Sequence, residues 1–321
     1  MESVVGGDQL ESLRSWRAQG RPALEAASTR LAHHPGFPEA ARALAANMLA
    51  AGDKDKALRG IFKDAGRYIV AMLAIYLHLG GGLTLARLKD FCAMSGLVSP
   101  GRARSLLLYL RYLGYVELFP VRGPGKAARY MPTAHFLASW SLHLKAALDA
   151  IAHIEPAAAI LRDRLDEPAV FDVVARLPAD GLRETASGGY EMDTAFFRVF
   201  LHRHAGSQII FLLLATNETF PPQGATPFSL AAASRRFGVS RIHIRRLLDA
   251  GAAEGLLRSD GEGSVVFEEA GRVAVEKNYR DQLTHLLAAA AAAIDEVADA
   301  VSAAAEARPR VAHAQAQMGL M

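Results

Sequence analysis

VSPGRARSLLLYLRYLGYV, residues 98–116, has a second version in the same chain, VSRIHIRRLLDAGAAEGLL at residues 239–257. At a constant offset of 141 positions the two segments share six identical pairs: Val98/Val239, Ser99/Ser240, Arg104/Arg245, Leu106/Leu247, Leu107/Leu248 and Gly114/Gly255. Each segment has a serine that can cap a helix, a basic helix with an apolar back, and a glycine that ends the helix. The chain therefore contains a duplicated helical unit.

The sequence around each copy follows the same order. In the first half we expect a buried apolar helix over residues 67–79, a short helix after Thr84, the basic helix after Ser99, two short strands around residues 122–126, and a long helix through residues 136–151. The second half repeats this order, with an apolar helix over 207–216, the two-helix unit at 228–257, a hairpin at 258–268 and an Ala-rich helix from about Arg272. The stretch from Leu85 to Val98 is longer than that from Leu230 to Val239, so we expect a longer turn in the first half.

This order of elements resembles the winged helix-turn-helix regulators of the MarR type. The resemblance implies a mainly α fold with small β-wings, in which two tandem winged helix-turn-helix domains joined by long helices form a single-chain pseudo-dimer. The second half fits best, with the turn Phe237-Gly238-Val239-Ser240 at the expected place. We expect four regions: an N-terminal helical segment (1–60), a first winged-helix domain (61–160), a connecting segment with short helices (161–190), and a second winged-helix domain (191–321).

Composition favours a folded protein and allows nucleic-acid binding. The 321 residues are 51% hydrophobic, the net charge is +3 and the pI is about 9.0. The single cysteine, Cys92, excludes an internal disulfide framework. The N-terminal residues do not read as a signal peptide, and the apolar run 286–294 is too short to span a bilayer. We therefore expect a cytoplasmic, nucleoid-associated protein, bacterial in type.

The second basic helix carries the clearest candidates for DNA contact. If Ile244, Leu247 and Leu248 point inward, the cationic side chains lie on the outer face near the helix N-terminus, where a docked recognition helix touches bases and phosphates. The candidates on this unit are Arg235, Arg236, Ser240, Arg241, His243, Arg245 and Arg246. The alternative interpretation is an ordinary solvated basic helix face.

The first unit offers a second, less charged set of candidates. Those on its helix are Arg102, Arg104, Ser105 and Tyr109, and those on its wing are Arg122, Lys126 and Arg129. A basic wing can follow phosphates or enter the minor groove, whereas the second wing carries Asp260 and Glu262 and should be repelled. We therefore expect unequal contacts and an imperfectly palindromic site, although the first wing can equally be a solvated turn.

Other chemistry has weaker support. The resemblance implies a small-molecule effector as a candidate ligand, which Tyr109, Tyr112 and Tyr115 could contact, but these rings fit core or surface positions better. The histidines lack the spacing of metal ligands, so we expect no metal and no cofactor. Cys92 fits a small buried residue better than a redox sensor. No nucleotide-binding loop, nucleophile elbow or HExxH motif occurs, so we do not expect an enzyme.

The expected function is sequence-specific binding of double-stranded DNA by a transcriptional regulator with two non-identical winged units. The alternative is a protein-interaction or chromosome-architecture scaffold built on tandem winged helices. The apolar residues Leu283, Leu287, Ile294 and Val297 form a heptad-like seam near the C-terminus. This seam must pack on the helix around residues 134–152 or on another chain, so we expect a monomeric pseudo-dimer or a homodimer through the C-terminal helices.

Overall fold

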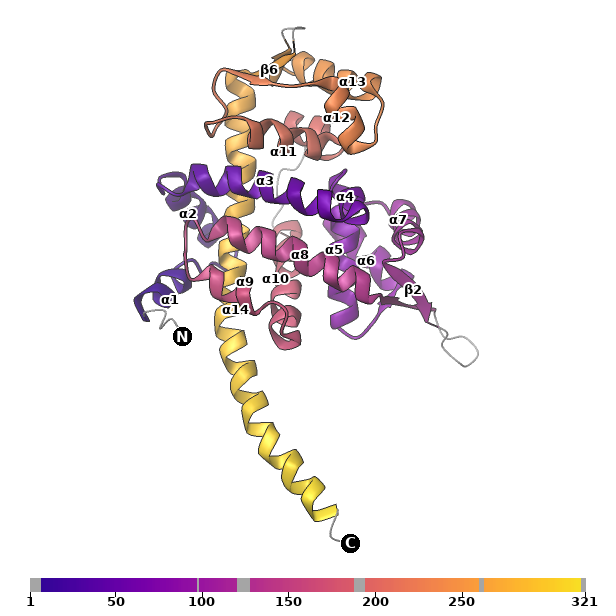
Figure 1. Ribbon diagram of the computed structural model, residues 1–321, viewed down its shortest axis with the longest axis vertical. Coiled ribbons are helices and arrows are strands. Elements are labelled where there is room, and N and C mark those ends of the chain that lie inside the picture. Colours follow the sequence, from indigo (N-terminus) through magenta and orange to yellow (C-terminus); the bar gives the residue numbers. More distant parts are fainter. Residues whose placement is uncertain (1–6, 97, 120–127, 188–193, 260–262, 319–321) are drawn as a thin grey trace.

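The protein is mainly α-helical and contains two small three-stranded antiparallel sheets (Figure 1). The computed structural model describes residues 7–96, 98–119, 128–187, 194–259 and 263–318. Within these ranges, every helix is too short or too polar to cross a membrane. The expected fold class is confirmed at this level, a mainly α protein with small β elements.

The first repeat unit, called the first unit below, runs from α5 to α8. Its elements are α5 (Ala65–Leu79), β1 (Leu83–Thr84), α6 (Leu85–Ser95), α7 (Pro100–Tyr112), β2 (Val116–Phe119), β3 (Arg129–Pro132) and α8 (Ala134–Ile151). The strand order in its sheet is β1-β3-β2, with Leu83 opposite Tyr130 and Leu118 also opposite Tyr130. The predicted hairpin is present, and the sheet gains a third strand that the sequence did not indicate.

The second repeat unit, called the second unit, has the same order of elements. They are α11 (Gly206–Thr216), β4 (Ala225–Pro227), α12 (Leu230–Phe237), α13 (Arg241–Ala253), β5 (Leu257–Ser259), β6 (Ser264–Phe267) and α14 (Glu269–Met318). The sheet order is β4-β6-β5, which matches the first sheet strand for strand. The duplication seen in 19 residues of sequence therefore extends to the topology of both units.

The two units differ in their first helix more than in their turn. The sequence predicts a longer turn in the first unit, but α6 has 11 residues against 8 in α12, so most of the extra length is helical. Both helices end at a glycine with positive φ, Gly96 (67°) and Gly238 (62°). Helix α6 continues because no glycine or proline interrupts residues 85–95.

In the described part of the chain, four helices precede the first unit, and one of them, α3, packs between the two units. They are α1 (Gly7–Arg14), α2 (Arg21–Ala32), α3 (Phe37–Lys54) and α4 (Lys56–Ile61). Helix α3 contacts α8 of the first unit and α11 of the second, and Figure 1 shows it lying between them. The contacts are made by an apolar face that includes Ala41, Leu44 and Met48, all of which are buried. Residues 37–54 thus hold the units in a fixed relation.

The segment between the units is more regular than predicted. We expected short helices and a linker at 161–190, whereas α9 (Ala158–Arg164) is followed by α10 (Pro168–Ser187), a helix of 20 residues with Pro178 inside it. The short stretch η1 (Phe197–Leu201) then leads into α11. Helix α10 forms because its buried residues Val170, Val174 and Ala175 recur at helical spacing and pack against α5 and α14.

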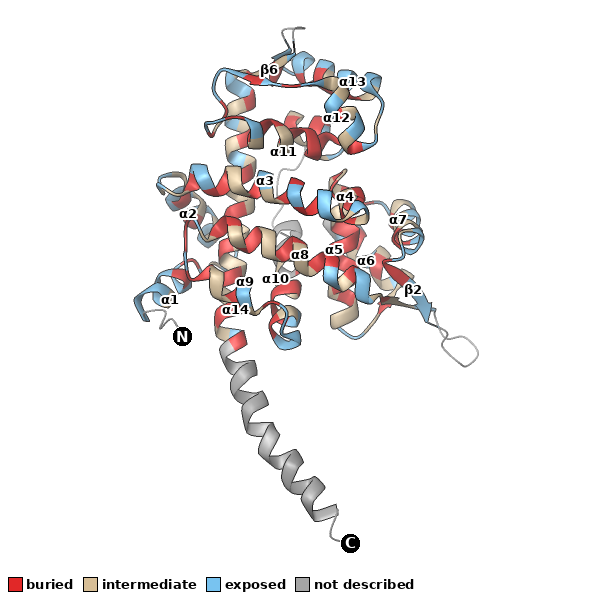
Figure 2. Cartoon of the chain, viewed as in Figure 1, coloured by how far each residue is buried: buried red, intermediate tan, exposed pale blue. Residues whose placement is uncertain are grey.

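Helix α14 crosses both units, and its apolar seam is covered within the chain. Leu283, Leu287, Ile294 and Val297 are buried, and α10 makes the largest set of contacts with α14, ahead of α2, α1 and α8. The seam therefore packs mainly on α10, a helix that we did not predict, rather than on α8 alone. Figure 2 shows the buried residues continuing through the middle of the molecule and into α14.

Candidate nucleic-acid interface

Helix α13 of the second unit presents a basic outer face. Ser240 caps the helix by accepting a hydrogen bond from the His243 backbone N–H at 3.1 Å. Ile244, Leu247 and Leu248 are buried, as the sequence predicts. Arg241, Arg245 and Arg246 are exposed, and within the described residues none of them makes an ion pair. These three guanidinium groups are available to an anionic partner.

Glycine is required on the inner face of α13. A Cβ atom at Gly251 would lie 2.8 Å from Cζ of the buried Phe200 ring, so a larger residue here would have to displace that ring from the inner face of α13. The inner face of α13 thus packs on Phe200, while the opposite face, with Arg245 and Arg246, is exposed to solvent.

His243 lies at the edge of this face and is engaged in an internal contact. Its Nε2 atom is 2.7 Å from the carbonyl oxygen of His204, and the His243 side chain is half-buried. The two imidazole rings meet edge to face, with centroids 5.9 Å apart. Burial and the nearby cations Lys63 and Arg67 lower the pKa of His204 to about 4, so this ring is neutral at physiological pH. We expected His243 on or beside the outer face; it lies beside that face, where it attaches α13 to the segment before α11.

The two arginines at the end of α12 differ in their contacts within the described residues. Arg235 is exposed. Arg236 forms an ion pair with Asp53 at the end of α3, with Nη2 and Oδ2 2.6 Å apart, and its backbone carbonyl accepts a hydrogen bond from Arg59. Arg236 therefore connects the second unit to the N-terminal helices, and of these two candidates for DNA contact only Arg235 is unpaired within the described residues.

Two of the four candidates on α7 face the interior. Nη2 of Arg102 lies 2.9 Å from Oδ1 of Asp64, a buried carboxylate that also accepts from Arg67 at 3.2 Å. The Tyr109 hydroxyl accepts a hydrogen bond from Arg67 at 3.1 Å, and the Arg67 guanidinium lies over its ring. Arg104 and Ser105 are exposed, as predicted. The outer face of α7 thus has fewer cations than its sequence suggests.

The outer face of the first unit is partly apolar. Leu108 and Tyr112 lie one turn apart on α7 and are 47% and 84% exposed. Leu118 and Phe119, on strand β2, are 44% and 52% exposed. Helix α13 has one comparable residue among those described, Ile242. The two units therefore present different surfaces at equivalent positions.

The wings can be compared only in part. Arg122 and Lys126 lie outside the described residues, as do Asp260 and Glu262 of the second hairpin. Arg129 is exposed on β3 and packs beside Gly82. Arg258 on β5 pairs with Glu268, with Nε and Oε1 3.0 Å apart. The expected difference in wing charge stays a prediction.

A group of cations that the sequence analysis did not select lies where the units meet. Arg59, Lys63 and Arg67 come from α4, the loop after it and α5, and each is half-buried. Burial and the charges of Lys63 and Arg67 lower the pKa of His204, in the segment that precedes α11 of the second unit. The spacing of four between these cations was visible in the sequence, but it precedes the repeated segment, so nothing connected it with the basic helices.

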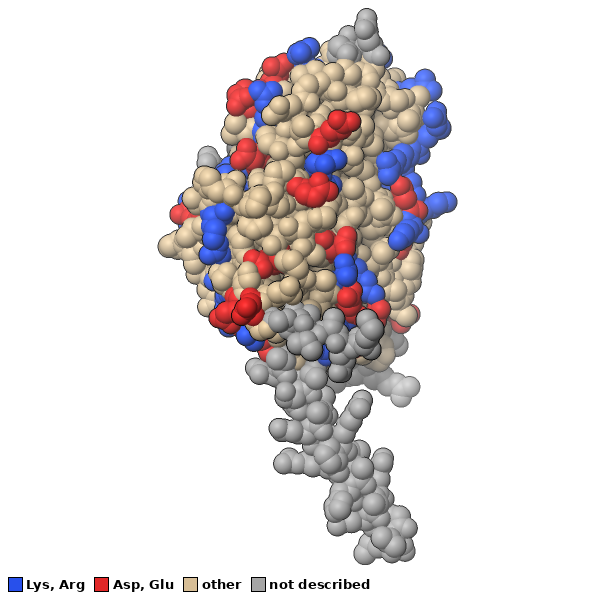
Figure 3. All heavy atoms as spheres, turned by 60° about the vertical axis from the view of Figure 1, so that its left-hand side comes forward, with Lys and Arg blue, Asp and Glu red and all other residues tan. Residues whose placement is uncertain are grey.

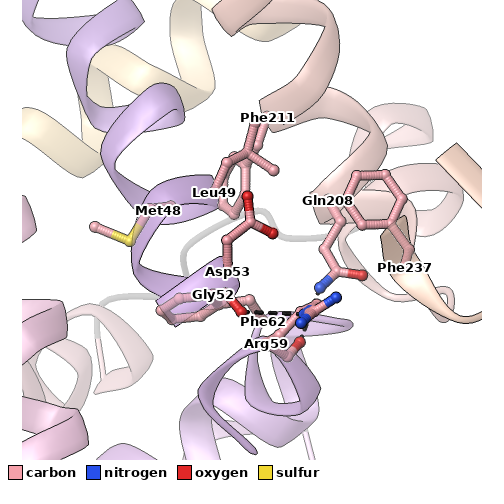
Figure 4. A pocket seen from close by; sticks show the side chains of 9 residues that line it. All are labelled: Met48, Leu49, Gly52, Asp53, Arg59, Phe62, Gln208, Phe211 and Phe237. Atoms are coloured by element: carbon pink, nitrogen blue, oxygen red, sulfur yellow. Dashed lines mark hydrogen bonds between the residues drawn. The ribbon is translucent and has the colours of Figure 1, made fainter. Parts of the chain in front are cut away.

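The same junction contains a small pocket between α3 and α4 on one side and α11 and α12 on the other (Figure 4). It is partly open to solvent, has room for about one water molecule, and its wall is mostly apolar, with Met48, Phe62, Phe211 and Phe237. Gln208 reaches across and donates a hydrogen bond from Nε2 to the carbonyl oxygen of Arg59 at 2.8 Å. This bond joins α11 of the second unit to α4, which directly precedes the first unit.

The three tyrosines considered for an effector pocket do not share one. Tyr115 is fully buried and stacks on Phe136, with ring centroids 4.5 Å apart. Tyr112 is exposed, and Tyr109 is held by Arg67. Cys92 is buried, and burial raises its thiol pKa to about 11, which disfavours the reactive thiolate. Among the described residues, no three His, Cys, Asp or Glu side chains cluster as metal ligands would.

Charge is distributed unevenly over the surface. Figure 3 shows a face on which acidic and basic side chains alternate, while Lys and Arg gather along one edge of its upper half. A mixed surface binds polyanions weakly, so the basic regions matter more than the net charge of +3.

Compared with known proteins, the chain matches no protein family, no curated protein and no solved structure.

Proposed function

We propose that this protein is a sequence-specific double-stranded DNA-binding protein and transcriptional regulator built from two tandem winged helix-turn-helix units. The proposal is supported by the repeated order helix, strand, helix, helix and hairpin, with sheets β1-β3-β2 and β4-β6-β5 arranged alike. In such a unit the second helix of the two-helix motif enters the major groove. That helix is α7 in the first unit and α13 in the second.

The observation that carries the proposal is the outer face of α13. Arg241, Arg245 and Arg246 are exposed, have no ion-pair partner among the described residues, and stand in the first two turns of the helix. Arginine can bind guanine O6 and N7 with two hydrogen bonds, or pair with phosphate. DNA binding would cost these arginines little free energy, because no ion pair among the described residues has to be broken first.

The test is selection of genomic fragments by the purified protein at low and physiological salt, followed by measurement of Kd for the selected site. Arg245→Ala with Arg246→Ala should weaken specific binding by about 30-fold or more, since each good base contact contributes about 1–3 kcal/mol. The matched control is Lys145→Ala with Arg164→Ala, which removes two cations from ion pairs on α8 and α9. Equal weakening by both double variants would show a general charge effect and contradict the assignment of α13.

A second candidate function, a protein-interaction scaffold, is favoured by the exposed apolar residues of the first unit. Leu108, Tyr112 and Phe119 are unusual on a surface meant for DNA alone. The test is Tyr112→p-benzoylphenylalanine followed by irradiation in cells. Protein adducts at this position that disappear with Leu108→Ser would support the scaffold, whereas nucleic-acid adducts would place DNA on this face.

A further inference from the structure

Lys63 occupies an unusual place in the molecule. It follows α4, directly precedes Asp64, the N-cap of α5, and is half-buried. Within the described residues its ammonium group makes no ion pair and no hydrogen bond. Most of the neighbouring charged side chains have partners, because Asp64 binds both Arg67 and Arg102, and Arg59 donates to the carbonyl oxygens of Gly52 and Arg236.

The surroundings of Lys63 are cationic. Burial, with Arg67 and Arg59 nearby, lowers its pKa. Together with burial of the imidazole ring, the charge of Lys63 also lowers the pKa of His204, in the segment that precedes α11. The Asp64 carboxylate is shared by two arginines, so it does not neutralise the group. A half-buried cation beside other cations is unfavourable by itself and becomes favourable when an anion binds there.

The group lies between the two candidate recognition helices. On one side, Arg102 in the first turn of α7 reaches Asp64, next to Lys63 in the chain. On the other side, Arg59 donates a hydrogen bond to the carbonyl oxygen of Arg236, at the end of α12. His243 in the first turn of α13 contacts His204, whose pKa is lowered by burial and by the charge of Lys63. The N-terminal turns of α7 and α13 are therefore both attached to the surroundings of one lysine. Figure 1 shows the two helices on the same side of the molecule.

We propose that Lys63, with Arg59 and Arg67 beside it, forms a phosphate-binding site at the junction of the two units, and that its ligand is a backbone phosphate of the bound DNA. The inference rests on the proposed function and adds a contact that neither unit makes alone. A strand that follows the outer faces of α13 and α7 passes this site between them. The two units then contact one continuous tract of backbone, held at its middle by Lys63.

The experiment measures DNA affinity against salt for Lys63→Gln, Lys63→Arg and the wild type, using the selected duplex. Loss of one phosphate contact should make the slope of log K against log salt less steep by about 0.9. Between about 50 and about 200 mM salt, the variant should therefore lose about three- to fourfold less affinity than the wild type. Lys63→Arg should keep the wild-type slope. The control is Lys145→Gln, which removes a half-exposed lysine elsewhere and should also keep it.

Hydroxyl-radical footprinting gives a second readout. Arg245→Ala/Arg246→Ala and Arg104→Ala identify the tracts protected by each unit, and Lys63→Gln should expose the sugars between them. An unchanged slope and footprint in Lys63→Gln, with wild-type DNA binding, would overturn the junction site alone. A wild-type chain that retains no duplex at either salt would overturn the proposed function and the junction site together. Thermal melting of each variant verifies folding.

Discussion

His243 and His204 are joined by a 2.7 Å contact between the imidazole Nε2 of the first and the carbonyl oxygen of the second. This contact fixes the first turn of α13 to the segment that precedes α11. We expect His243→Ala to lower the free energy of unfolding by about 1 kcal/mol, because it removes one partly buried hydrogen bond. Chemical denaturation measures the change. His202→Ala, at an exposed position, is the control; an equal effect of both variants would show that the contact contributes nothing specific.

Asp64 should be important for the first unit. Its side chain is 6% exposed, caps α5 through the Arg67 backbone N–H at 3.0 Å, and binds two guanidinium groups. Asp64→Ala should lower the free energy of unfolding by about 2 kcal/mol, since it removes the cap and leaves two half-buried cations without a carboxylate. Asp166→Ala, at a carboxylate that is 77% exposed, should change it by less than about 0.5 kcal/mol. Similar melting curves for both variants would contradict this role of Asp64.

The protein should lose stability in mild acid through His143. This side chain is buried, and burial lowers its pKa to about 4 from 6.5. Since the folded-state pKa is the lower one, the contribution of neutral His143 is complete above about pH 6.5 and is lost as the pH falls towards 4. Between about pH 7 and about pH 5 the loss amounts to about 2 kcal/mol.

The measurement is denaturant unfolding of wild type and His143→Gln over this pH range. Whatever its stability at neutral pH, the variant should depend less on pH by the amount given. Tyr68 contacts Nε2 of His143 at 3.1 Å, so glutamine keeps a polar partner for the hydroxyl. Parallel pH profiles for the two proteins would show that His143 does not titrate in this range.

The sequence predicted the helices better than the side-chain partners. The cap, apolar stripe and terminating glycine of α7 and α13 are local signals, and both helices lie where those signals place them. The partner of Arg102, in contrast, is 38 residues away, and that of His243 is 39 residues away. No local pattern separates an arginine that faces solvent from one that bonds a distant carboxylate. For the same reason Lys63, whose neighbours come from both units, gave no signal.

The sequence also did not predict the two short strands β1 and β4. β1 has two residues and β4 has three, too few to show the alternation that indicates a strand. They form because β3 and β6 offer an open edge once each hairpin has folded. Helix α10 is longer than the short helices expected at 161–190, and it contains Pro178. A proline within a helix costs stability, which the packing of α10 against α5 and α14 offsets.

At Gly271, α14 packs closely against the backbone just before strand β5 of the second sheet. A Cβ atom there would lie 1.7 Å from the carbonyl oxygen of Leu256, which is backbone and cannot move aside easily. Gly271→Ala should therefore lower the free energy of unfolding by more than about 2 kcal/mol. Gly101→Ala, on α7 with nothing within 4 Å of the added atom, should be neutral or stabilising by up to about 1 kcal/mol. Differential scanning calorimetry compares the melting temperatures of the two variants. A Gly271→Ala protein as stable as the wild type would contradict the close packing of α14 at this position.

The buried part of α14 should be needed for folding within a single chain. Leu283, Leu287 and Val297 are buried, mainly against α10. A chain that ends at residue 282 exposes the apolar surface of α10 and should aggregate or melt at a clearly lower temperature, since each large buried side chain contributes about 1.5–3 kcal/mol. A chain that ends at residue 300 keeps this contact and should melt like the full protein. Size-exclusion chromatography and melting curves distinguish the two. If the shorter chain is monomeric and equally stable, α14 does not hold the units together, and the contact between α3 and α11 must do so by itself.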